Sequence, residues 1–189
     1  MATNQVVLEK PETSTPSQID VCLSELNEAR ERYAKTAITE RIALAEACLQ
    51  GIAAEAHTWV DAASRAKGGP DNKALRSEEI LAGPVSALRY LRLLITSLRD
   101  LEKTGTVQLP GKIETGPNGK LRVQVVPAKG LYDSAAFAGM HVSAWMQEGI
   151  TRENLKDHLA THYRSGQAGT PRVSLVLCAG NVSSIPVPD

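Results

Sequence analysis

The chain has 189 residues, of which 21 are lysine or arginine and 21 are aspartate or glutamate, so its formal net charge is zero. This balance argues against a nucleic-acid-binding protein, which usually carries a basic excess or patch. No apolar run reaches the roughly 20 residues that a membrane span needs, and residues 1–16 lack the layout of a signal peptide, so we expect no membrane association and a cytoplasmic location. The three cysteines form no CxxC pair, so neither a disulfide framework nor a metal site is predicted.

A helical N-terminal part is predicted for residues 17–105, after a lead-in at residues 1–16 whose threonine, serine and proline content indicates disorder. Three segments place apolar residues at the spacing of an amphipathic helix. The first covers about 17–35, and the third covers about 77–103 with a break at Gly83–Pro84. The second begins near Thr36, which is expected to cap it, and ends at Gly68–Gly69–Pro70.

A β-hairpin and a connecting segment are predicted for residues 106–170. The strands, at 112–114 and 121–126, flank a turn whose Asn118–Gly119 supplies the positive φ angles of a tight hairpin. A further strand is predicted at 141–147 and a short helix at 151–163. His158 and His162 would lie one turn apart on that helix, but no third ligand accompanies them, so we interpret them as solvent-facing side chains.

Residues 171–189 are predicted to begin an α/β domain. The segment 172–178 contains Val-Ser-Leu-Val-Leu, a dense apolar run typical of a strand buried on both faces of a parallel sheet. Small residues follow it, and they let a ligand approach the backbone at the carboxyl end of the strand. A parallel strand needs a crossover and a partner strand, so we expect the domain to be incomplete at Asp189. Alternatively, this strand is the last one of a small α+β domain.

Three segments resemble the N-terminal portion of the aldehyde dehydrogenase superfamily. Residues 176–186, Val-Leu-Cys-Ala-Gly-Asn-Val-Ser-Ser-Ile-Pro, are similar to the strand and turn that open its coenzyme domain, in particular to a bacterial subgroup whose turn reads Gly-Ala-Gly-Asn-Val-Ser-Ser-Ile-Pro. Residues 39–42 followed by Trp59, and residues 79–84, resemble its N-terminal helices. The resemblance implies an α/β fold with a helical front, a β-hairpin and the first strand of an incomplete Rossmann-like coenzyme domain.

The resemblance also implies a chemistry. Members of the family oxidise an aldehyde to an acid with NAD or NADP, through a cysteine thiolate that attacks the carbonyl. The asparagine of the turn donates a hydrogen bond to the oxyanion, a role that matches Asn181, and the turn backbone borders the nicotinamide, which implicates Ala179 and Gly180. The catalytic cysteine and glutamate of the family lie beyond position 189, so the 189-residue chain alone is expected to be inactive. The resemblance leaves open which aldehyde is used and whether the coenzyme is NAD or NADP.

A second interpretation is a non-catalytic α+β module for binding or assembly. The hairpin at 112–126 is its candidate surface for forming a homo-oligomer, because a free strand edge can recruit a partner strand.

Cys178 occupies a position that glycine usually holds in the family, and we interpret it as an apolar filler rather than a nucleophile. Glu78 and Glu79 are interpreted as a solvated pair at a helix start.

Overall fold

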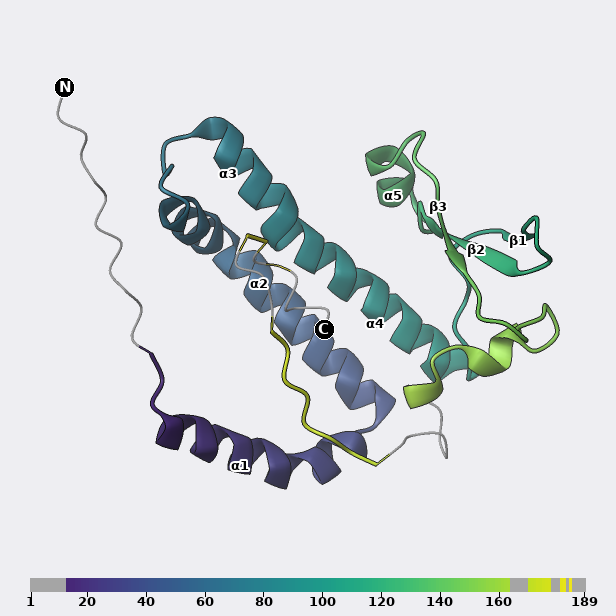
Figure 1. Ribbon diagram of the computed structural model, residues 1–189, viewed down its shortest axis with the longest axis horizontal. Helices are drawn as coiled ribbons and strands as arrows, with labels where there is room; N and C mark the ends of the chain where they lie inside the picture. The colour runs from purple at the N-terminus through teal and green to yellow at the C-terminus, as the bar shows by residue number, and fades with distance from the viewer. Residues whose placement is uncertain (1–12, 164–169, 178–180, 183, 185–189) are drawn as a thin grey trace. The chain divides into compact units, whose positions relative to one another are not determined.

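The computed structural model describes residues 13–163, 170–177, 181, 182 and 184. Its described part is of mixed α and β structure, with four longer helices, a short fifth helix and a three-stranded antiparallel sheet (Figure 1). The chain divides into two compact units, one made of Met1–Leu98 with Thr170–Asp189 and the other of Arg99–Gly169. Most of the lead-in predicted at 1–16 lies outside the described residues.

Four helices follow one another in the predicted order. They are α1 (Pro16–Ala34), α2 (Ile38–Ala66), α3 (Lys73–Ile80) and α4 (Ser86–Thr104), with a π-helical turn η1 (Leu81–Val85) joining the last two. α1 begins with a capping box, in which Thr15 and Gln18 each satisfy a backbone N–H of the other. α4 ends at Thr104, and the Gly105 that follows has a φ of 71°, the left-handed conformation common just after a helix C-terminus.

The predicted cap of α2 is wrong. The N-cap is Ala37, which makes no side-chain cap hydrogen bond. Thr36 instead directs its hydroxyl backwards and donates it to the Arg32 carbonyl oxygen at the end of α1. The turn between the two helices is held by Arg41, which donates to the carbonyl oxygens of Tyr33, Ala34 and Thr36.

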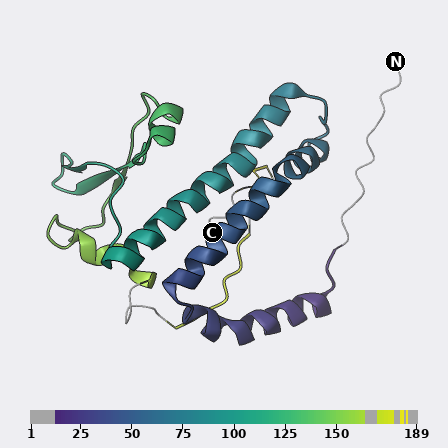
Figure 2. The same cartoon turned by 180° about the vertical axis from the view of Figure 1, so that it is seen from behind.

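The core of the first unit lies between α2 and α4, which run side by side in both views (Figures 1 and 2). One cluster of buried residues there consists of Ile42 and Ala45 from α2 and Ile95 and Leu98 from α4. The two helices approach because each presents an apolar stripe at helical spacing, and burying the two stripes together removes both from water. The predicted break between α3 and α4 at Gly83–Pro84 is present as η1.

The second unit contains the predicted hairpin and third strand. Strands β1 (Ile113–Thr115), β2 (Leu121–Val126) and β3 (Val142–Trp145) pair antiparallel in the order β1-β2-β3. Gly119 has a φ of 78°, as the tight turn requires. A short helix, α5 (Leu131–Ala136), connects β2 and β3 and was not predicted.

The helix predicted at 151–163 is not formed. Two short 3-10 helices, Leu155–His158 and Thr161–Tyr163, replace it. Ala160 between them has a φ of 51°, which interrupts any continuous helix. His158 and His162 therefore lie on separate turns, and the one-turn helical spacing considered for them does not exist.

The strand predicted at 172–178 is also absent from its described part. Residues 171–177 form no strand, and the side chains of Leu175 and Leu177 are 82% and 88% exposed. An apolar run becomes a buried strand only when neighbouring strands and covering helices surround it. The sheet of the described residues consists of β1, β2 and β3, and residues 171–177 are not part of it.

Candidate functional site

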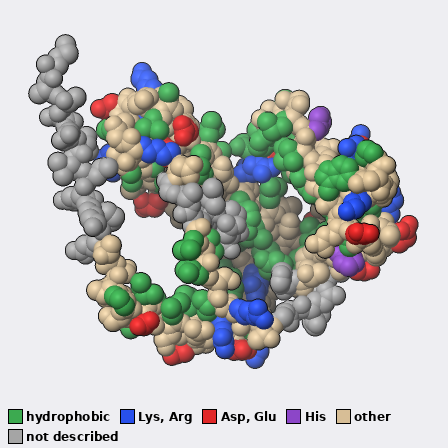
Figure 3. All heavy atoms as spheres, in the orientation of Figure 1, with side chains coloured by type: hydrophobic (Ala, Val, Ile, Leu, Met, Phe, Trp, Pro, Cys, Tyr) green, Lys and Arg blue, Asp and Glu red, His purple; other side chains and the backbone are tan. Residues whose placement is uncertain are grey.

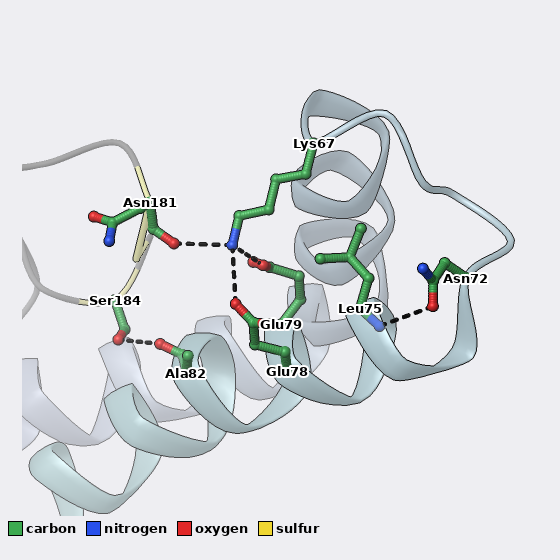
Figure 4. Close-up of polar contacts among 8 residues, drawn as sticks. All are labelled: Lys67, Asn72, Leu75, Glu78, Glu79, Ala82, Asn181 and Ser184. Carbon is green, nitrogen blue, oxygen red and sulfur yellow. Dashed lines mark hydrogen bonds and ion pairs between the residues drawn. The ribbon is translucent and has the colours of Figure 1, made fainter.

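The turn that carries Asn181 lies against the junction of α2, α3 and η1 (Figure 4). Two contacts attach it. The Lys67 ammonium, just after α2, donates to the Asn181 carbonyl oxygen at 2.9 Å. The Ser184 hydroxyl donates to the Ala82 carbonyl oxygen in η1. Residues more than 100 positions apart thus form one polar cluster.

Lys67 is the centre of this cluster. The end of α2 places it there, because Lys67 caps the helix and Gly68 follows with a φ of 75°, which turns the chain towards α3. Besides Asn181, its ammonium contacts the carboxylates of Glu78, at 3.4 Å, and Glu79. These two carboxylates raise the pKa of Lys67 above its ordinary value of 10.5, with the hydrogen bond to Glu79 as the largest cause.

Glu79 corrects the prediction of a solvated acidic pair. Glu78 is largely exposed, but the Glu79 side chain is only 2% exposed. A buried carboxylate is tolerated when an opposite charge and hydrogen bonds compensate its lost hydration. Lys67, whose own side chain is 27% exposed, provides that charge.

The kink at η1 explains how Ser184 attaches. Gly83 has φ −100° and ψ −110°, outside the helical region, and Pro84 has no N–H to donate. As a result the Ser86 N–H donates to the Gly83 carbonyl, one residue away from its α-helical partner. The Ala82 carbonyl, which that N–H would otherwise have used, accepts the Ser184 hydroxyl instead.

Asn181 is exposed, and its side-chain amide points away from Lys67 (Figure 4). Only its main-chain oxygen takes part in the described cluster, which leaves the amide N–H groups directed away from the junction. Ala179 and Gly180, the predicted coenzyme contacts, and Cys178 lie outside the described residues. The structure therefore brings one predicted site residue, Asn181, to a defined place.

Sequence analysis did not assign a role to Lys67. The available signals were its position directly before Gly68–Gly69–Pro70, where a helix ends, and the proximity of Glu79 in the chain. Neither reveals that the turn at Asn181 would return to this point. Among the described residues no group of three or more histidine, cysteine, aspartate or glutamate side chains could hold a metal ion. Within the same residues no helix is both long and apolar enough to cross a membrane.

Comparison of the chain with protein-family models, with curated proteins and with solved structures found no match.

Proposed function

We propose that this chain is the N-terminal part of an aldehyde dehydrogenase-type oxidoreductase, which oxidises an aldehyde to an acid with NAD or NADP. The observation that supports the proposal is the contact between two segments that resemble that superfamily. Residues 79–84 and residues 176–186 are far apart in the chain, and the hydrogen bond from Ser184 to Ala82 joins them. The proposal rests on this contact between the two segments.

In this proposal Asn181 stabilises the oxyanion of the tetrahedral intermediate. An amide N–H is a suitable donor, because it carries partial positive charge without a proton to lose at neutral pH. Such a donor must be held still and must point away from its anchors. Lys67 holds the main-chain oxygen of Asn181, while the side chain is exposed and remains available to a ligand.

Whether this turn suits the coenzyme can be judged at Asn181. Its exposed side chain and its anchored backbone suit a turn that borders a ligand. Ala179 and Gly180 would lie along the nicotinamide, and their small size lets a ring approach the backbone. When bound, NAD or NADP would accept the hydride of the aldehyde. The chain's own contribution is to orient the turn and to donate the hydrogen bond.

The test is a coupled activity measurement. The reading frame should be followed past Asp189, and its whole product should be purified and assayed for NADH or NADPH formation with aliphatic and aromatic aldehydes. We expect reduction of one coenzyme by an aldehyde, and no turnover by the 189-residue chain alone. Lack of coenzyme reduction with every aldehyde, or turnover by the 189-residue chain, would contradict the proposal.

A non-catalytic α+β assembly module is the second candidate. The observation in its favour is the sheet of the second unit, in which β3 is an edge strand whose Val142 and Trp145 side chains are 44% and 51% exposed. An open edge with exposed apolar residues can accept another strand. This candidate predicts no coenzyme reduction by any product of the reading frame, so the same assay separates the two.

A further inference from the structure

The Lys67 ammonium contacts three oxygens at the junction of α2, α3 and η1. They are the Asn181 main-chain oxygen and one carboxylate oxygen each of Glu78 and Glu79 (Figure 4). A lysine ammonium has three N–H donors, so each donor can be matched with one of these acceptors. An ammonium matched in this way cannot turn aside without losing a contact. The two carboxylates therefore direct the remaining N–H towards Asn181.

The two glutamates hold Lys67 unequally, although they are adjacent in the chain. Figure 3 shows side chains of both charges at the upper left, where α3 and the end of α2 lie in Figure 1. The Glu78 side chain is 63% exposed and its oxygen lies 3.4 Å from the ammonium, whereas Glu79 is 2% exposed and its contact is the shorter one. Water weakens an exposed ion pair, while a buried carboxylate that lost its partner would stay uncompensated. Glu79 is therefore the residue that keeps Lys67 in place.

The residues of η1 and of the end of α3 attach the turn at two points. Glu79 and Ala82 are three residues apart in continuous helix, so they lie on the same side of it. The Ala82 carbonyl accepts the hydroxyl of Ser184, a residue that is 7% exposed. Glu79 acts on the other end of the turn, because its partner Lys67 donates to Asn181. One side of this helical segment thus binds the turn directly at one end and through a lysine at the other.

We propose that Glu79 is a positioning residue for Asn181. It fixes the Lys67 ammonium, which fixes the main-chain oxygen of Asn181 and with it the direction of the side-chain amide. A donor to an oxyanion must be in place before the charge develops, because reorientation during the reaction would reduce the stabilisation. Glu79 acts through Lys67 and does not touch the reacting atoms. The catalytic consequence rests on the proposed oxidoreductase function, whereas the placement of the turn does not.

Carbonyl NMR of the 189-residue chain tests the placement without any activity measurement. The carbon resonance of a carbonyl responds to the hydrogen bond that its oxygen accepts. Glu79→Gln keeps the size of the side chain and removes its charge, so it should shift the Asn181 carbonyl resonance. Glu78→Gln is the matched variant, because it removes the same charge from the exposed neighbour, and it should cause a smaller shift. An unmoved resonance in folded Glu79→Gln, or equal shifts in the two variants, would overturn the proposal.

The unaltered chain offers a second measurement, which does not depend on whether a variant folds. Each N–H of the Lys67 ammonium has an acceptor within the protein. Its protons should therefore exchange with water more slowly than the ammonium protons of Lys120, which is exposed. NMR detection of the lysine ammonium groups compares the two rates. Equally fast exchange would mean that the contacts of Lys67 with Glu79 and Asn181 do not persist in solution, which is incompatible with the proposal.

Kinetics of the whole reading-frame product test the consequence for the reaction. Glu79→Gln should lower kcat by about 10- to 100-fold, because a small displacement of a catalytic group is costly, and Glu78→Gln should lower it less. In an Asn181→Ala background, Glu79→Gln should lower kcat no further, since the donor that it positions is absent. A residue that only stabilises the fold would lower kcat by the same factor in both backgrounds, and that result would contradict a positioning role.

The two kinds of measurement separate failure of this inference from failure of the proposed function. If the whole product reduces no coenzyme, the oxidoreductase function is wrong, and the carbonyl and ammonium resonances still decide whether Glu79 places the turn. If the product is active but Glu79→Gln affects kcat no more than Glu78→Gln does, the function stands and the positioning role of Glu79 is wrong.

Discussion

The Lys67 ammonium nitrogen and the main-chain oxygen of Asn181 lie 2.9 Å apart, although 114 positions separate the two residues in the chain. The same ammonium contacts the buried carboxylate of Glu79. One lysine therefore satisfies an internal charge of the helical junction and anchors the turn that carries the proposed oxyanion donor.

Removal of the Lys67 charge should destabilise the helical unit. Lys67→Met leaves the Glu79 carboxylate buried without its partner, and an uncompensated buried charge is costly. We expect a clearly lower urea midpoint. Asp61→Asn is the matched control, because it breaks the ion pair between Asp61 and Arg76, which also joins α2 to α3 but is 43% and 35% exposed. The free energy of unfolding of Asp61→Asn should fall by roughly 0.2–1 kcal/mol. Equal effects of the two substitutions would contradict the assigned importance of Lys67.

The same ion pair predicts a dependence on alkaline pH. Glu79 and Glu78 raise the pKa of Lys67 in the folded state, so the folded protein binds the proton more tightly than the unfolded chain. The resulting stabilisation is complete below the ordinary pKa of 10.5 and is lost as the pH rises through the folded value. Lys67→Arg keeps its charge in this range, so its urea midpoint should fall less than that of the unaltered chain between pH 9 and 11.5. If the urea midpoints of the two proteins fell equally with pH, the alkaline loss of stability could not be assigned to Lys67.

Ser184 should control the attachment of the Asn181 turn. Ser184→Ala removes the hydrogen bond to the Ala82 carbonyl, which should cost about 1 kcal/mol and release the turn while the helical core stays folded. Amide hydrogen exchange should become faster at Asn181 and Val182. Thr96→Ala, which deletes an exposed hydroxyl bonded within α4, is the control and should leave those amides unchanged. Unchanged exchange in the Ser184 variant would show that the turn is held by other contacts.

Gly116 should determine where the Trp145 ring lies. A Cβ at position 116 would come within 2.4 Å of the ring carbon Cζ3 of Trp145, closer than two carbons can approach. The ring is 51% exposed and can rotate away, so Gly116→Ala should displace it without unfolding the sheet. The Trp145 indole N–H resonance should shift in the NMR spectrum. In Gly119→Ala, where a Cβ meets nothing but the φ of 78° is strained, stability should fall while that resonance stays close to its original position.

Local signals predicted most of the elements. The helices α1 to α4, the break at Gly83–Pro84 and the hairpin each depend on periodicity or on glycine and proline at defined positions, which act over a few residues. The helix predicted at 151–163 is wrong because the apolar spacing in the sequence continues across Ala160, whose φ of 51° interrupts the helix. The strand at 172–178 failed because a buried strand depends on neighbours that its own residues do not specify.

The candidate site was predicted only at Asn181. Its anchors are Lys67 and the Ala82 carbonyl, and both act across more than 100 residues. A long-range contact of this kind leaves no periodic pattern in either segment. The sequence likewise did not reveal the burial of Glu79, because two adjacent acidic residues in a helix are usually exposed to solvent.

The central claim is that Asn181 donates the hydrogen bond that stabilises the oxyanion. The most direct measurement compares kcat for aldehyde oxidation by the whole reading-frame product with that of its Asn181→Ala variant, at saturating aldehyde and coenzyme. Our account predicts that kcat falls by about 10²–10³-fold, with the urea midpoint of the variant unchanged because the anchoring main-chain oxygen is retained. An unchanged kcat in a variant that folds normally would contradict it.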